Sequence, residues 1–134
     1  MRYNYPSGSY YEGDTIDDAF NGKGIFYFSN GDIYEGQFKN DMFEGIGIYK
    51  FKSGAKYSGL FSNDKFHGIG TLLFEDGTIE KGKFHEDKRV GKFYQIENNE
   101  KYEIIYQNDN LLKYNKVDFI PENKFPYIDN FHNL

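Results

Sequence analysis

Short runs of apolar and aromatic residues alternate with polar residues and glycines along most of the chain. Gly24-Ile25-Phe26-Tyr27-Phe28 is one such run, and a second run over 32–38 follows Asn30-Gly31. Two short runs separated by Asn-Gly predict a β-hairpin, because a type I′ turn needs a positive φ at both central residues. Ser53-Gly54 and Asp76-Gly77 repeat the turn signal, and the intervening connections are polar. The pattern predicts an all-β chain that meanders through successive hairpins.

The pattern recurs with a fixed step of 23 residues, which is the spacing of Gly13, Gly36, Gly59 and Gly82. Aromatic columns keep the same step: Tyr11, Tyr34 and Tyr57; Phe20, Phe43 and Phe66; Phe28, Phe51 and Phe74; Phe38, Phe61 and Phe84. A constant period in the range of 20–50 residues is typical of repeat arrays. We therefore expect an elongated, single-layer antiparallel sheet built from about four repeats, each contacting only its neighbours.

The repeats divide the chain into an array over 1–114 and a C-terminal extension over 115–134. The array comprises a part-unit at 5–10, repeats at 11–33, 34–56 and 57–79, a degenerate repeat at 80–102 and a fading half-unit at 102–114. In the degenerate repeat Glu80 replaces the tyrosine and Phe93 replaces a glycine. Terminal repeats are often atypical because one face has no neighbour. The extension contains Pro121 and Pro126 among aromatic residues, and we expect it to pack on the last hairpin or on a partner.

Alternation along each strand assigns the side chains to faces. Tyr34, Gly36 and Phe38 share one face, and Gly45, Gly47, Tyr49 and Phe51 share the same face of the partner strand. Rings of one strand are therefore predicted to lie over the bare backbone of glycines on the next. Such packing compensates for the poor strand propensity of glycine.

Composition narrows the function classes. The chain has 16 basic and 21 acidic residues, a net charge of −5, which argues against a nucleic-acid footprint and a polybasic lipid patch. It has no cysteine, which excludes a disulfide framework and cysteine-based zinc sites. The N-terminus lacks the apolar segment of a signal peptide, and no run approaches the roughly 18 apolar residues of a membrane span. We expect a cytoplasmic protein.

The repeat resembles a known family. Tyr34-Glu35-Gly36-Gln37-Phe38 through Gly45-Ile46-Gly47, and the copy that starts at Tyr57 and ends with Gly68-Ile69-Gly70, match the pattern of the MORN repeat (membrane occupation and recognition nexus). The resemblance implies a twisted antiparallel sheet with an aromatic groove. It also implies a eukaryotic, non-enzymatic scaffold or adaptor of the cytoskeleton, cilium (axoneme or basal body) or membrane contacts.

No constellation for catalysis or metal binding is apparent. His67, His85 and His132 lack metal-ligand spacing, and the Gly-Ile-Gly copies lack the third glycine of a phosphate-binding loop. The aspartate column, Asp18, Asp41, Asp64 and Asp87, has two interpretations. Clustered oxygens suit Ca²⁺, whereas a turn aspartate can stabilise its own turn through backbone bonds. One carboxylate per repeat favours the turn interpretation, so we expect no metal site. We also expect no catalytic site and no cofactor.

The aromatic columns offer the candidate binding site, because one sheet layer without helices leaves ring surface exposed. We predict a partner-binding groove lined by Tyr11, Phe20, Tyr34, Phe43, Tyr57 and Phe66, with a rim of Glu12, Asp32, Glu35 and Glu44. Phe28, Phe51, Phe74, Phe38, Phe61 and Phe84 are predicted to be core, and packing core is also the alternative for the groove residues. The expected partner is a protein, supplying an amphipathic helix or an extended peptide. The alternative is a phosphoinositide or membrane tether, which the scattered lysines do not favour.

Overall fold

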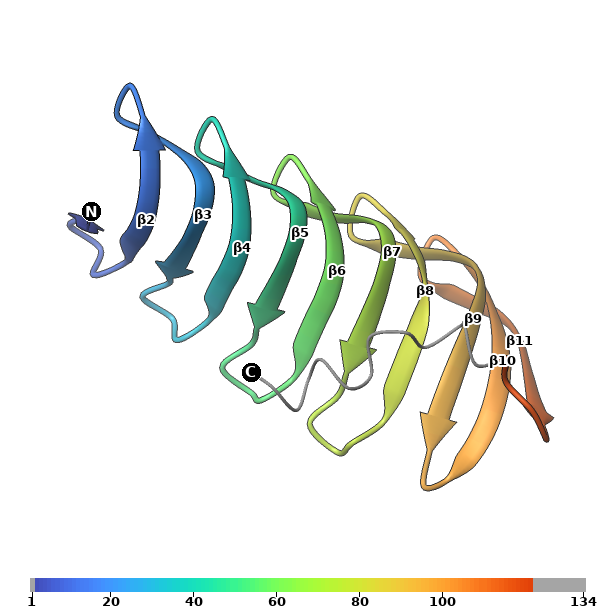
Figure 1. The fold of residues 1–134 in the computed structure, drawn as a ribbon. Coiled ribbons are helices and arrows are strands. Elements are labelled where there is room, and N and C mark those ends of the chain that lie inside the picture. The colour runs from blue at the N-terminus through green and yellow to red at the C-terminus, as the bar shows by residue number, and fades with distance from the viewer. Residues whose placement is uncertain (1, 122–134) are drawn as a thin grey trace.

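The computed structural model describes residues 2–121, which form one open antiparallel sheet of 11 strands in sequence order (Figure 1). The strands are β1 (Arg2–Asn4), β2 (Tyr10–Ile16), β3 (Ala19–Tyr27), β4 (Ile33–Lys39), β5 (Met42–Lys50), β6 (Lys56–Ser62), β7 (Lys65–Leu73), β8 (Ile79–His85), β9 (Lys88–Glu97), β10 (Glu100–Gln107) and β11 (Asn110–Val117). The described residues include no helix. The predicted all-β, single-layer meander is confirmed.

The sheet is slightly longer at both ends than the predicted units. β1 pairs with β2 through Tyr3 and Tyr11, so strand pairing begins before the part-unit at 5–10. β11 continues to Val117, three residues beyond the expected end of the array at 114. The first residues of the predicted extension therefore belong to the sheet, and its residues 122–134 lie outside the described part of the chain.

The type I′ turns form at the polar two-residue connections and not at the glycine-containing turns where the sequence predicted them. Asn40 and Asp41 have φ of 49° and 71°, and Asn63 and Asp64 have φ of 50° and 69°. These two-residue connections therefore have the positive φ at both positions that defines type I′ turns. At Asn30-Gly31 only the glycine has positive φ, and its N–H donates to Phe28 O at 3.1 Å. The prediction of a type I′ turn at Asn30-Gly31 was wrong. The type I′ turns form at the Asn-Asp connections instead, because Asn and Asp also tolerate the left-handed region.

Glycines make room for tyrosine rings, as predicted. A Cβ added to Gly47 would lie within 2.7 Å of three side-chain atoms of Tyr34. A Cβ on Gly36 would lie 2.5 Å from the Cα of Gly47 across the strand pair. No larger residue fits at either position, and the strands curve strongly (Figure 1).

The core is a column of rings that runs through successive repeats. Tyr11 stacks on Phe20 with centroids 3.7 Å apart, and Tyr34 stacks on Phe43 at 3.9 Å. Phe38 contacts Tyr11 and Tyr34 edge-on at 5.0 and 5.1 Å, so it joins one stack to the next. Edge-to-face and offset-stacked pairs each contribute about 0.5–1.5 kcal/mol beyond the burial of their area. Ring packing of this kind accounts for the stability of a sheet that no second layer covers within residues 2–121.

Three of the four turn aspartates, Asp41, Asp64 and Asp87, bond to the repeat before them. Asp64 Oδ1 accepts from Phe43 N at 2.7 Å, and Asp64 N donates to Phe43 O at 3.1 Å. The same two bonds join Asp41 to Phe20 and Asp87 to Phe66. For these three aspartates the interpretation that each stabilises its own turn is therefore corrected: they join neighbouring hairpins, and we call this pair of bonds the aspartate clamp.

The fourth repeat replaces a ring stack with charges. Glu80 stands in the tyrosine column and is only 3% exposed. Its Oε1 accepts from Tyr106 Oη at 2.7 Å and lies 3.4 Å from a guanidinium nitrogen of Arg89. Arg89 Nε in turn lies 2.8 Å from Asp109 Oδ1. The buried carboxylate is thus compensated, and the tyrosine–phenylalanine stacks end with the third repeat.

Candidate functional site

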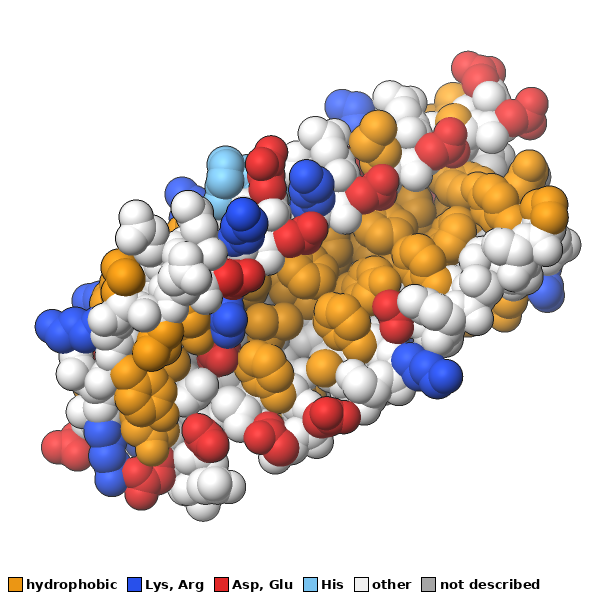
Figure 2. Space-filling model, turned by 180° about the vertical axis from the view of Figure 1, so that it is seen from behind, with side chains coloured by type: hydrophobic (Ala, Val, Ile, Leu, Met, Phe, Trp, Pro, Cys, Tyr) orange, Lys and Arg blue, Asp and Glu red, His pale blue; other side chains and the backbone are white. Residues whose placement is uncertain are grey.

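Half-buried rings form a continuous row beside the core. Phe26 contacts Phe28 at 4.7 Å, Phe28 contacts Tyr49 at 5.7 Å, and Tyr49 contacts Phe51 at 4.8 Å. A cavity opens onto this row and is lined by Tyr5, Phe20, Phe26, Phe28, Asp41, Phe43, Tyr49 and Asp64. We call this row and cavity the aromatic groove. Figure 2 shows hydrophobic side chains gathered in a hollow along the long axis of the molecule.

The charged residues that line the groove are acidic. Asp41 and Asp64 line the cavity, because the clamp bonds each carboxylate to the backbone N–H of a phenylalanine that also lines it. Asp32 accepts from Tyr49 Oη at 2.7 Å and from Lys52 N at 2.8 Å. Burial, and then the Asp32 carboxylate, raises the pKa of Tyr49, so this phenol stays neutral and donates. In Figure 2, Asp and Glu side chains follow both edges of the hollow, with Lys and Arg side chains among them.

A second cavity, toward the fourth repeat, is also lined by acidic residues. This cavity begins at Phe74 and is lined by Glu75, Asp76, Thr78, Glu80, Gln95 and Glu97. Its charged lining residues are all carboxylates. An apolar surface with such edges can accept a segment that carries apolar side chains flanked by Lys or Arg.

Three of the six predicted groove residues are inaccessible. Tyr11, Tyr34 and Tyr57 are 0% exposed, and the hydroxyl of Tyr34 donates to Gln37 O at 2.6 Å. These tyrosines cannot contact a partner, because they lie between the glycine backbone and the phenylalanine rings. Phe20 and Phe43 are buried but border the cavity, and Phe66 is half-buried. The prediction of these three tyrosines as partner contacts is therefore corrected, and they belong to the core.

The rings that do line the groove include residues assigned to the core from the sequence. Phe28, Phe51 and Phe74 are half-buried, whereas Phe38, Phe61 and Phe84 are buried as predicted. Phe26 and Tyr49 were not singled out as groove residues. The sequence pattern could have identified them, because alternation places Phe26 and Tyr49 on the same face as Tyr34 and Gly47, nearer the longer turns.

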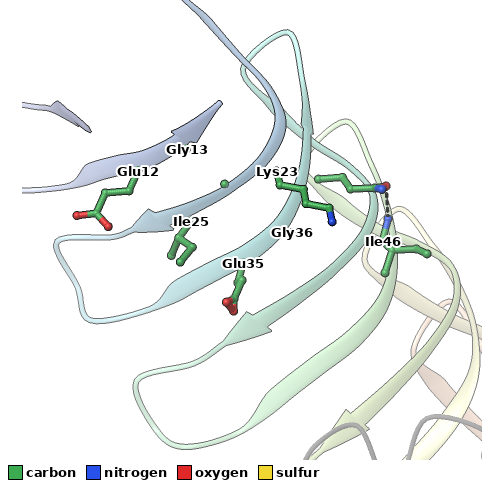
Figure 3. A pocket seen from close by; sticks show the side chains of 9 residues that line it. Glu12, Gly13, Lys23, Ile25, Glu35, Gly36 and Ile46 are labelled. Atoms are coloured by element: carbon green, nitrogen blue, oxygen red, sulfur yellow. Dashed lines mark hydrogen bonds between the residues drawn. The ribbon is translucent and has the colours of Figure 1, made fainter. Parts of the chain in front are cut away.

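The predicted rim is also corrected. Glu12 and Glu35 lie on the opposite face of the sheet, where they line a shallow pocket with Ile25 over the bare backbone of Gly13 and Gly36 (Figure 3). Glu44 Oε2 accepts from Asn63 N at 3.1 Å, so it reinforces the clamp. Of the four rim residues, only Asp32 bonds to a residue of the groove.

Other candidate chemistry is weak in the described part of the chain. His67 Nδ1 accepts from Glu86 N at 3.3 Å, and its ring lies 5.0 Å from that of His85. Residues 2–121 contain no group of three or more His, Cys, Asp or Glu side chains placed to hold a metal ion. Among these residues there is also no helix that could cross a membrane. His132 lies outside the described residues.

Comparison with known proteins identifies the repeat. The chain has no significant match among curated proteins. The family model of the MORN repeat matches residues 11–33, 34–56 and 57–79, together just over half of the 134 residues. MORN repeats are non-catalytic modules of protein and membrane interaction. The matched units are the three with an intact tyrosine–phenylalanine stack, and the chain therefore belongs to the MORN-repeat family.

Proposed function

We propose that the chain is a non-enzymatic scaffold or adaptor whose aromatic groove binds a basic, amphipathic segment of a protein partner. The observation that supports this most is the row from Phe26 to Phe51, where half-buried rings meet a cavity whose charged residues, Asp41 and Asp64, are both acidic.

The physical case rests on desolvation and charge. Aromatic side chains in a preformed groove are the usual anchors of binding energy, because they release much apolar surface from water at small entropic cost. An amphipathic helix presents apolar residues three and four positions apart, which suits an elongated apolar groove. Flanking lysines or arginines then lie near the carboxylates, which speeds association and selects against acidic segments.

The negative charges of Asp41 and Asp64 can be removed while the hydrogen bonds of the aspartate clamp are kept. In Asp41→Asn with Asp64→Asn, an amide oxygen still accepts from the N–H of Phe20 and Phe43, and Asn tolerates the positive φ. We expect this variant to bind a leucine–lysine model helix of about 16 residues at least threefold more weakly, with a smaller salt dependence. Fluorescence anisotropy titrations measure both quantities.

A matched control lies on the other face. Glu12→Gln with Glu35→Gln removes the same charge from the opposite pocket and should leave binding of the model helix unchanged. Phe28→Ala with Phe51→Ala should reduce binding more than tenfold while the circular dichroism spectrum stays that of a sheet. Equal loss in the control and the groove variants would refute the groove as the binding site.

The alternative of a phosphoinositide or membrane tether makes a different prediction. Flotation with vesicles that contain phosphatidylinositol bisphosphate would carry the chain upward regardless of the Asp41 and Asp64 substitutions. A cytoskeletal or ciliary location remains a prediction from the family resemblance. Imaging of a tagged chain in the source cell, with co-purification of bound proteins, tests it.

A further inference from the structure

The aromatic groove has the same period as the sequence. Three ring pairs have nearly the same geometry, with centroids 4.7 or 4.8 Å apart: Tyr3 with Tyr5, Phe26 with Phe28, and Tyr49 with Phe51. Leu72 and Phe74 follow at the next step of 23 residues. The first member of each pair lies on β1, β3, β5 or β7, so the pairs succeed one another along the sheet. Tyr3 and Tyr5 are exposed and the later members are half-buried, so the groove presents accessible apolar surface once per repeat.

The next step of the same two columns is polar. Gln95 and Glu97 stand where the earlier repeats have a ring pair. Gln95 Nε2 donates to Glu80 Oε2 at 3.3 Å, and Glu97 lines the second cavity together with Glu75 and Asp76. The groove therefore consists of four apolar steps and one acidic end.

The length of one step indicates which backbone conformation fits. A repeat contributes two strands at about 4.8 Å spacing, so the ring pairs succeed one another at about 9.6 Å. Seven residues of an α-helix rise about 10.5 Å and return to nearly the same face. A helix inclined by roughly 25° to the line of the repeats advances by the same amount per heptad. Each heptad also has two apolar positions, one for each ring of a pair.

Other conformations fit this groove less well. Three residues of an extended strand span about 10 Å, but the third side chain then points to the other side. Three residues of polyproline II span about 9.3 Å on one face, but their backbone N–H and C=O groups have no internal partner. The groove offers them little, because Tyr49 Oη already donates to Asp32 and phenylalanine rings have no donor. A helix bonds its own backbone groups, so it avoids the cost of burying them unpaired.

We propose that the groove binds an amphipathic helix of about four heptads, with one heptad over each ring pair and a basic end over Gln95 and Glu97. This inference rests on the proposed function of the groove and specifies the spacing, the length and the charged end of its ligand. A helix with a coiled-coil type of heptad pattern has these features.

Fluorescence anisotropy titrations of the full 134-residue chain with two alanine–lysine helices of about 30 residues test the proposal. One helix carries a leucine at every seventh position. The other contains the same amino acids with a leucine at every eighth position, so its leucines drift off the groove. A single leucine per heptad keeps the free helix from forming a coiled coil of its own. We expect the heptad helix to bind about tenfold more tightly than the other, and a fifth heptad to add little.

The acidic end has a separate test. An added lysine pair at one end of the heptad helix should strengthen its binding about threefold. Glu97→Gln should abolish this gain without weakening the binding of the helix that lacks the pair. Glu12→Gln, on the opposite face, is the matched control and should leave the gain intact. A gain that survives Glu97→Gln would refute the position of the basic end.

The outcomes separate this inference from the proposed function. Equal binding of the two helices, with both weakened by Phe28→Ala and Phe51→Ala, would overturn the heptad spacing but not the groove. Binding that these two substitutions do not weaken would overturn both. A proline-rich peptide that binds more tightly than the heptad helix would overturn the choice of a helix. Circular dichroism of each variant confirms that the sheet is intact.

Discussion

The ring of Phe93 lies over Gly82 in the fourth repeat, so that a Cβ on this glycine would collide with it. In the third repeat the ring of Tyr57 covers Gly70, the glycine whose place Phe93 takes. The aromatic ring has therefore moved from one strand of the hairpin to the other. The two departures from the repeat pattern, Glu80 and Phe93, compensate for each other, and Glu80 is free to bond Arg89 and Tyr106 instead.

This compensation predicts non-additive mutations. Phe93→Gly removes a ring that is 0% exposed and should cost about 3–5 kcal/mol. Glu80→Tyr with Arg89→Phe should cost about 1–3 kcal/mol, because the new ring meets Phe93. All three together rebuild the repeat pattern and should cost clearly less than the sum. Urea denaturation measures each free energy of unfolding, and strictly additive costs would contradict the compensation.

The aspartate clamp predicts a contrast at one position. Asp64→Ala removes the acceptor for Phe43 N and leaves alanine at a φ of 69°, and should cost about 2–3 kcal/mol. Asp64→Asn keeps an oxygen that accepts from Phe43 N and a residue that tolerates the positive φ, and it should cost less than about 1 kcal/mol. Thermal or urea unfolding distinguishes the two. If the two substitutions cost the same, the carboxylate charge rather than the hydrogen bond would matter.

The buried phenol of Tyr34 predicts a small but specific loss. Tyr34→Phe keeps the ring over Gly47 and removes the bond to Gln37 O, so it should cost about 1–2 kcal/mol. Tyr94→Phe, at a half-buried position on the opposite face, is the control and should change the free energy of unfolding by less than about 0.5 kcal/mol. A loss for Tyr34→Phe no larger than that of the control would mean that this hydrogen bond contributes nothing.

The same tyrosines predict instability in alkali. Burial raises the pKa of Tyr34 and Tyr57 above the ordinary value, despite the backbone bonds that oppose the shift. Above a pH of about 10 the unfolded chain loses these protons and the folded chain keeps them, so stability falls as pH rises, by about 1.4 kcal/mol per pH unit for each tyrosine. Below that pH their contribution is complete. Tyr34→Phe with Tyr57→Phe should flatten the decline in urea titrations between pH 9 and 12, and an unchanged slope would refute this origin.

The sequence was sufficient for the period, the faces and the packing of Tyr34 on Gly47, because each follows from local alternation repeated in every unit. It did not show which rings remain accessible. Tyr34 is hidden because Phe43 stacks on it and Phe38 and Phe61 flank it, an arrangement that depends on the bend of the strands. Glu35 was wrongly predicted to lie on the rim of the groove, although alternation along the strand already places it on the other face of the sheet from Tyr34. The partners of Glu80 could not be foreseen, because Tyr106 lies 26 residues away outside the repeat pattern.

The central claim is that the aromatic groove, and not the opposite face, binds a basic amphipathic segment. Nuclear magnetic resonance titration of the full chain with the leucine–lysine model helix tests it most directly, because each face carries its own reporters. The account predicts that ring and backbone signals of Phe28, Tyr49 and Phe51 shift, while those of Glu12, Ile25 and Glu35 stay in place. Shifts confined to the second set, or to β11, would contradict it.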